Sequence, residues 1–197
     1  MDHDFWHNKW DKNEIGFHEP NGNALLVKYA SYLLSSPHPR IFVPLCGKSL
    51  DIHWLLANGC EVIGAELSEL AIKQLFKELN VAPLVTKCGN HLCYSADKIT
   101  IFVGDFFQLS KDQLGKISSV YDRAAMVALP DQLRRSYAAH LTDVTNKAPM
   151  LVISFSYDQS LMEGPPFSVT TSMVTSLYPN YKVELIEQSA AEEKLKG

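Results

Sequence analysis

The sequence predicts a doubly wound α/β domain, in which a mostly parallel sheet carries helices on both faces. Runs with the β-branched and aromatic character of buried parallel strands occur at residues 41–43, 62–65, 99–103, 120–122 and 150–155. Helical patterns alternate with these runs along the chain. Because crossovers between parallel strands are right-handed, we expect the carboxyl ends of the strands to meet at one rim of the sheet.

Two amphipathic helices are predicted between the strands. Apolar residues recur at helical spacing from residue 72 to residue 79, behind Ser68, which is a good N-cap residue. A second helix follows Pro130, with an apolar or aromatic residue at every fourth position from residue 133 to residue 141. We find no internal repeat.

A turn at residues 44–49, with the sequence Pro-Leu-Cys-Gly-Lys-Ser, joins the first strand to a helix. Gly47 lets the backbone approach a ligand closely where that helix begins. A phosphate-binding P-loop needs another glycine five positions earlier, where Phe42 stands, and only one of the three glycines of a dinucleotide fingerprint is present. The turn therefore predicts a ligand without an anchored phosphate.

Glu66 ends the second strand, nineteen positions after Gly47. In doubly wound sheets a carboxylate at about this spacing accepts hydrogen bonds from ribose hydroxyls. The alternative is a favourable charge at the N-terminus of the helix that follows Ser68.

The third predicted strand runs into Gly104, Asp105 and Phe106. An acidic group and a flat aromatic ring suit the amine and the face of an adenine, although ordinary turn formation explains Gly104 and Asp105 as well. Three such turns, at three successive strand ends, open on the edge where these folds bind ligands. Together they predict an adenosine site.

Several segments follow one another along the chain in a specific order. They are Phe5 and Trp6, Trp10, and residues 15–18, 44–49, 64–69, 121–125 and 164–167. Single motifs are weak, but the tryptophan-rich start, the Pro-Leu-Cys-Gly-Lys turn and the Asp-Arg-Ala segment together are specific. In this order the segments resemble the thiopurine S-methyltransferase family over roughly residues 5 to 187.

The resemblance implies a Rossmann-like class I methyltransferase fold and S-adenosylmethionine as the methyl donor, which agrees with a phosphate-free adenosine site. It implies that the N-terminal segment closes over the donor. Residue by residue, it implies donor contacts at Trp10, Leu45, Glu66 and Arg123. It aligns Asp105 and Phe106 with adenine contacts and implies that Phe17 contacts the acceptor. From the residues alone, the pair Trp6 and Trp10 is also explained by packing on a helix.

The chemistry requires little from the protein, because the donor methyl is already activated by its sulfonium. The enzyme must align an acceptor sulfur in line with the methyl group. A thiol at its reference pKa needs about 2 kcal/mol to ionise at pH 7. Arg123 is the candidate catalytic cation, with a structural ion pair to Asp122 or Glu66 as the alternative. We expect Phe17 and Phe167 to form apolar walls against a flat acceptor.

Composition agrees with one enzyme domain spanning residues 1–197. The resemblance implies that residues 1–35 of this domain are a helical cap segment over the active site. The formal net charge of −4 and the interspersed charges give no indication of nucleic-acid binding. The polar start, and the lack of an apolar stretch long enough to span a membrane, favour a cytoplasmic protein. We expect a monomer whose partner is a small-molecule thiol.

Cys88, His91 and Cys93 lie within six residues, and their side chains are of the types that bind zinc. A structural zinc site needs a fourth ligand, and no second pair follows nearby. We therefore expect no metal and interpret residues 88–93 as part of a loop. The four cysteines show no disulfide framework and should be reduced in the cytosol.

The chain departs from the family at its C-terminus. After residues 183–187 it ends at Gly197, whereas the family continues into a final antiparallel strand, which we expect to be missing here. In the family this strand lies between the fifth and sixth strands, so its absence is expected to leave an unpaired backbone edge inside the sheet. Two functional alternatives stay open: methylation of selenium, tellurium or halide species at the same site, or a donor-binding protein that has lost catalysis.

Overall fold

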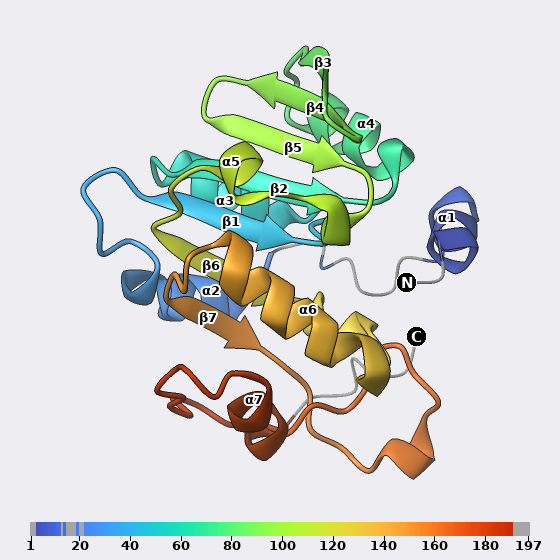
Figure 1. Ribbon diagram of the computed structural model, residues 1–197, viewed down its shortest axis with the longest axis vertical. Coiled ribbons are helices and arrows are strands. Elements are labelled where there is room, and N and C mark those ends of the chain that lie inside the picture. The colour runs from blue at the N-terminus through green and yellow to red at the C-terminus, as the bar shows by residue number, and fades with distance from the viewer. Residues whose placement is uncertain (1–2, 13, 15–18, 20–21, 191–197) are drawn as a thin grey trace.

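The computed structural model describes residues 3–12, 14, 19 and 22–190. Its seven-stranded sheet has the order β3-β4-β5-β2-β1-β6-β7 (Figure 1). The strands are β1 (Arg40–Pro44), β2 (Glu61–Glu66), β3 (Leu84–Cys88), β4 (His91–Ala96), β5 (Ile99–Val103), β6 (Ser119–Arg123) and β7 (Met150–Ile153). The five predicted strands correspond to β1, β2, β5, β6 and β7, and all neighbouring pairs among them are parallel.

Helices cover both faces of the sheet, as predicted. They are α1 (His3–Asp11), α2 (Ala24–Lys28), α3 (Leu50–Ala57), α4 (Glu69–Glu78), α5 (Lys111–Leu114), α6 (Asp131–Val144) and α7 (Thr171–Leu177). In Figure 1, α6 crosses in front of the sheet and α3 lies behind it. Short 3₁₀ helices occupy Ala30–Tyr32, Phe106–Gln108, Met126–Ala128 and Gln159–Leu161.

Alternation along β1 divides the core into two layers. Phe42 packs with Tyr137 and Leu141 of α6, whereas Ile41 and Val43 pack with residues of α3 and α4. Successive side chains of a strand point to opposite faces, so a strand with helices on both sides is apolar throughout. This is why the buried runs are readable in the sequence.

The interpretation of residues 88–93 as a loop is wrong. These residues are the centre of an antiparallel hairpin, in which Cys88 pairs with His91 across Gly89 and Asn90. Gly89 has a φ of +61°, a conformation that glycine adopts without strain and that tight hairpin turns require. The hairpin adds two strands to the sheet: β4 pairs antiparallel with β5, and β3 pairs antiparallel with β4 at the edge.

At the other edge, β7 has no further strand beside it within the described part of the chain. Residues 183–187 adopt no regular structure. Val183 packs on the α6 side of the core and Ile186 on the α3 side, so the segment passes from one face of the sheet to the other. Glu187 then accepts hydrogen bonds from Lys28 and Tyr29, at 2.6 Å each.

Candidate active site

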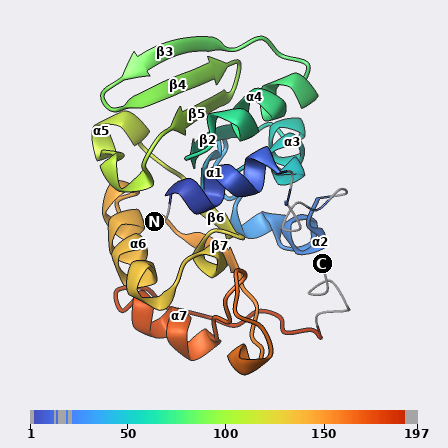
Figure 2. The ribbon, with the colours of Figure 1, turned by 90° about the vertical axis from the view of Figure 1, so that its right-hand side faces the viewer.

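The candidate site lies at the carboxyl ends of the parallel strands, where the chain order reverses between β1 and β6. Figure 2 looks onto this rim, with α1 in front of it. Leu45 follows β1 with a φ of +46°, and Ala124 follows β6 with a φ of +62°. The left-handed conformation is unfavourable for residues with a Cβ and is concentrated at functional sites. Two such residues therefore flank the point where doubly wound sheets bind ligands.

Glu66 lies at the end of β2 with only 6% of its surface exposed. One carboxylate oxygen accepts the backbone N–H of Gly47 and the other accepts that of Ser68, each at 2.8 Å. Burial raises the pKa of Glu66, against the opposing effect of these N–H groups. The bond to Ser68 fits the alternative role at the start of α4. Since each oxygen has two lone pairs, both retain capacity for a ligand hydroxyl.

Trp10, near the end of α1, covers the glycine turn. A Cβ added at Gly47 would lie 2.9 Å from its ring, and Gly47 has a φ of +51°. Any side chain here would therefore be strained and would collide with the indole. Trp10 is buried. Its ring lies against Gly47, and the Gly47 N–H donates to Glu66. Three predicted parts of the donor site that are distant in the sequence therefore lie together in the fold.

Cys46, in the same turn, is buried beneath the sheet ends. Its sulfur would lie 2.9 Å from a Cβ added at Gly64. Burial, and then the charge of Glu66, raises the pKa of this thiol well above its usual value.

Asp105 and Phe106 take different orientations. The Asp105 side chain accepts the N–H of Phe107 at 3.0 Å, which caps the short helix that follows β5. Phe106 is 1% exposed; in the core its ring stacks on Phe42 and packs at a tilt against Tyr137. The structure therefore does not favour the Phe106 ring as the surface that stacks on adenine.

Arg123 ends β6, and 9% of its side chain is exposed. Its Nη2 lies 3.4 Å from Glu19, and its Nε lies 3.4 Å from Asp51. The structural alternative was an ion pair of Arg123 with Asp122 or Glu66. Neither pair is formed among the described residues, so the partners expected for this alternative were wrong. No motif in the sequence marks Glu19 or Asp51 as partners of Arg123. Asp51 could have been noticed as an acid in the first turn of α3, a helix that starts at the rim.

Asp122 points the other way, into the core. It accepts hydrogen bonds from the Met126 N–H and the Tyr137 hydroxyl, and burial raises its pKa to about 6. The folded state therefore holds this proton more tightly than the unfolded chain does.

This shift predicts a pH dependence of stability. The raised pKa of Asp122 adds of the order of 3 kcal/mol to the free energy of unfolding. This stabilisation is fully present below about pH 4 and is lost as the pH rises through about 6. Asp122→Asn removes the titration, so the free energy of unfolding of wild type relative to this variant should fall between pH 4 and pH 7. Urea denaturation measures it, with the exposed Asp97→Asn as the control. Parallel curves for wild type and Asp122→Asn would contradict the assignment.

Phe167 lies beside the loop after β6, since its N–H donates to the Val127 carbonyl at 2.6 Å. Its half-buried ring packs on Gly164, and the Arg134 guanidinium lies 5.9 Å from its centroid. Phe17, the other predicted acceptor contact, lies outside the described residues.

Lys48 is engaged in an ion pair within the protein. Its Nζ pairs with Glu78 of α4 at 2.7 Å, and its side chain is largely buried. The hairpin residue His91 is also engaged in the structure, with Nε2 3.0 Å from the Asp105 carbonyl. Among the described residues, no group of three or more His, Cys, Asp or Glu side chains is arranged to hold a metal ion.

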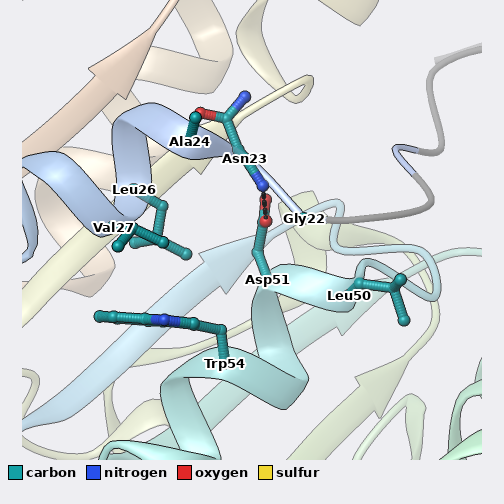
Figure 3. Close-up of a pocket in the computed structure, with 8 residues that line it drawn as sticks. All are labelled: Gly22, Asn23, Ala24, Leu26, Val27, Leu50, Asp51 and Trp54. Carbon is teal, nitrogen blue, oxygen red and sulfur yellow. Dashed lines mark hydrogen bonds between the residues drawn. The ribbon is translucent and has the colours of Figure 1, made fainter.

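A cavity of about 310 Å³ lies between α2 and α3, with Asn23, Trp54 and Asp51 in its lining (Figure 3). It contains none of the predicted donor residues. Asp51 nevertheless connects it to the rim, because the same carboxylate contacts Arg123.

The strand order, the reversal between β1 and β6 and the acidic end of β2 define a class I methyltransferase fold. A crystal structure of a SAM-dependent methyltransferase from Anabaena variabilis shares it, with a TM-score of 0.67 and 16% identity over 95% of this chain and 83% of the other. None of the helices described here is both long and apolar enough to cross a membrane.

The family profile described as Thiopurine S-methyltransferase (TPMT) matches residues 1–196. The chain is 49% identical to the thiopurine S-methyltransferase of Teredinibacter turnerae, over 98% of this chain and 90% of the relative. It is also 49% identical to that of Xanthobacter autotrophicus, over 100% and 93%. The chain belongs to the thiopurine S-methyltransferase family.

Proposed function

We propose that this protein transfers the methyl group of S-adenosylmethionine to the sulfur of small aromatic or heterocyclic thiols, such as thiopurines. The observation that carries the proposal is Glu66, a buried carboxylate at the switch-point rim, bonded to the glycine turn below Trp10. In this proposal the protein is a cytoplasmic monomer and residues 1–35 are its cap.

The residues at the rim fit the donor. In this proposal the remaining acceptor capacity of the Glu66 carboxylate binds the two ribose hydroxyls, and the turn around Gly47 admits close approach of a ligand. Asp105 accepts from the adenine amine in the same proposal, and Leu45 and Trp10 are further contacts of the donor. When bound, the donor supplies a methyl group activated by positive charge.

The protein's task is then to bind, orient and ionise the acceptor. Phe167, together with Phe17, provides apolar walls for a flat ring. Arg123 favours the thiolate over the thiol through its charge. Its carboxylate partners within the described residues, Glu19 and Asp51, differ, since 27% of the Glu19 side chain is exposed but only 1% of the Asp51 side chain. Glu19 is therefore the partner that an anionic acceptor can replace.

Product detection with an aryl thiol, selenite and iodide in parallel tests the proposal. We expect methyl transfer to the thiol. Turnover confined to selenite or iodide would reassign the acceptor, and donor affinity without turnover would indicate a binding protein that has lost catalysis.

A thermal-shift experiment separates this donor site from a nucleotide site. Because Lys48 is paired with Glu78, ATP with Mg²⁺ should leave the melting temperature unchanged. S-adenosylhomocysteine should raise it, since a ligand that binds only the folded state stabilises that state. A rise with ATP alone would restore the P-loop hypothesis.

A further inference from the structure

Four residues at the rim form a closed ring of polar contacts. Asp51 accepts the backbone N–H of Asn23 at 2.7 Å, and the Asn23 side chain donates to Glu19 at 3.1 Å. Glu19 lies 3.4 Å from Arg123, and Arg123 lies 3.4 Å from Asp51. The ring joins the segment before α2 to the start of α3 and the end of β6.

Asp51 is the most constrained member of the ring. It is 1% exposed, and its Oδ2 also accepts the hydroxyl of Tyr121 at 3.0 Å. Oδ1 is so close to the chain before α2 that a Cβ added at Gly22 would lie 3.3 Å from it, and Gly22 has a φ of +69°. One buried carboxylate therefore fixes a backbone segment with one oxygen and a guanidinium with the other.

We propose that Asp51 is a positioning residue for the acceptor site, which sets the plane of the Arg123 guanidinium and couples it to the segment that carries Glu19. The inference rests on the proposed function, in which Arg123 faces the acceptor. A guanidinium is a planar fork, so holding its Nε edge on Asp51 fixes the direction of its Nη groups. Without Asp51, only the more exposed Glu19 of these two acids would orient it.

A kinetic double-mutant cycle tests the coupling. Asp51→Asn should lower kcat/KM for an aryl thiol about tenfold or more, the loss expected for a hydrogen bond between charged groups, with donor affinity unchanged. In an Arg123→Ala background, Asp51→Asn should have little further effect on turnover. The control is Ser119→Ala, which removes one buried hydrogen bond, to the Leu33 carbonyl, from the other end of β6. It should lower stability without changing turnover. Equal effects of Asp51→Asn in both backgrounds would overturn the proposal.

A second measurement does not depend on activity. Hydrogen exchange, followed by NMR at the Asn23 amide and the Arg123 Nε–H, should accelerate about tenfold at both groups in Asp51→Asn. Because coupling is reciprocal, Arg123→Lys should also accelerate exchange at the Asn23 amide. This variant decides the question alone if Asp51→Asn does not fold, and an unchanged Asn23 rate would overturn the coupling. A wild type without turnover would refute the proposed function, while the exchange data would still report on Asp51.

Discussion

Glu66→Ala should lower the affinity for S-adenosylmethionine at least tenfold. The substitution leaves two ribose hydroxyls without their acceptor, and hydrogen bonds to a charged group are worth roughly 1.5 to 3 kcal/mol. It also frees the N–H groups of Gly47 and Ser68, so the melting temperature of the ligand-free protein should fall. Calorimetric titration with the donor measures the affinity.

The matched control for this experiment is Glu61→Ala, at the opposite end of the same strand. Glu61 is exposed and pairs with Arg40, so its loss should leave donor binding unchanged. A folded Glu66→Ala protein that binds the donor as wild type does would show that Glu66 serves only the turn and the start of α4.

Substitution of Arg123 should reduce turnover in a graded way. Arg123→Lys keeps a cation but loses the planar fork, whereas Arg123→Ala loses both and leaves Asp51 without its charged partner. Removing one member of a buried ion pair typically costs about 3 to 5 kcal/mol, so Arg123→Ala should also lower stability. Activity should therefore fall from wild type to lysine to alanine.

Acceptor acidity separates catalysis from structure at Arg123. If its charge stabilises a thiolate, the defect should shrink for more acidic thiols and at higher pH, where solvent removes the proton. Turnover of two thiols of different acidity, measured from pH 6 to 9 in wild type and both variants, checks this. Parallel pH profiles with an unchanged thiol preference would leave Arg123 a purely structural residue.

The parallel strands were predictable because both of their faces are buried. β1 and β2 have almost uninterrupted burial, which selects continuous apolar runs. β3 is exposed along most of its length, so its sequence lacks the continuous apolar run of a buried strand, and this strand was not predicted. The spacing of Cys88, His91 and Cys93 suggested a zinc site. The feature that indicates the hairpin is the Gly89-Asn90 turn between two short segments.

The position of candidate residues was predictable where a motif places them at successive strand ends. The rim position of Glu66 and Arg123 was predicted in this way, because the position on a parallel strand fixes which rim a residue reaches. Ion-pair partners were not predictable, since Glu19, Asp51 and Arg123 are far apart in the sequence. Side-chain direction was also hidden: Asp105 and Phe106 are neighbours, yet Phe106 belongs to the core.

Cys46 has a consequence for chemical selectivity. A protein proposed to methylate thiols carries a thiol of its own in the turn on which the donor site is built. Since the thiolate is the nucleophile, and burial together with Glu66 keeps Cys46 protonated at neutral pH, this sulfur is a poor rival for the methyl group. The same apolar packing that closes the turn thus protects the enzyme from alkylating itself.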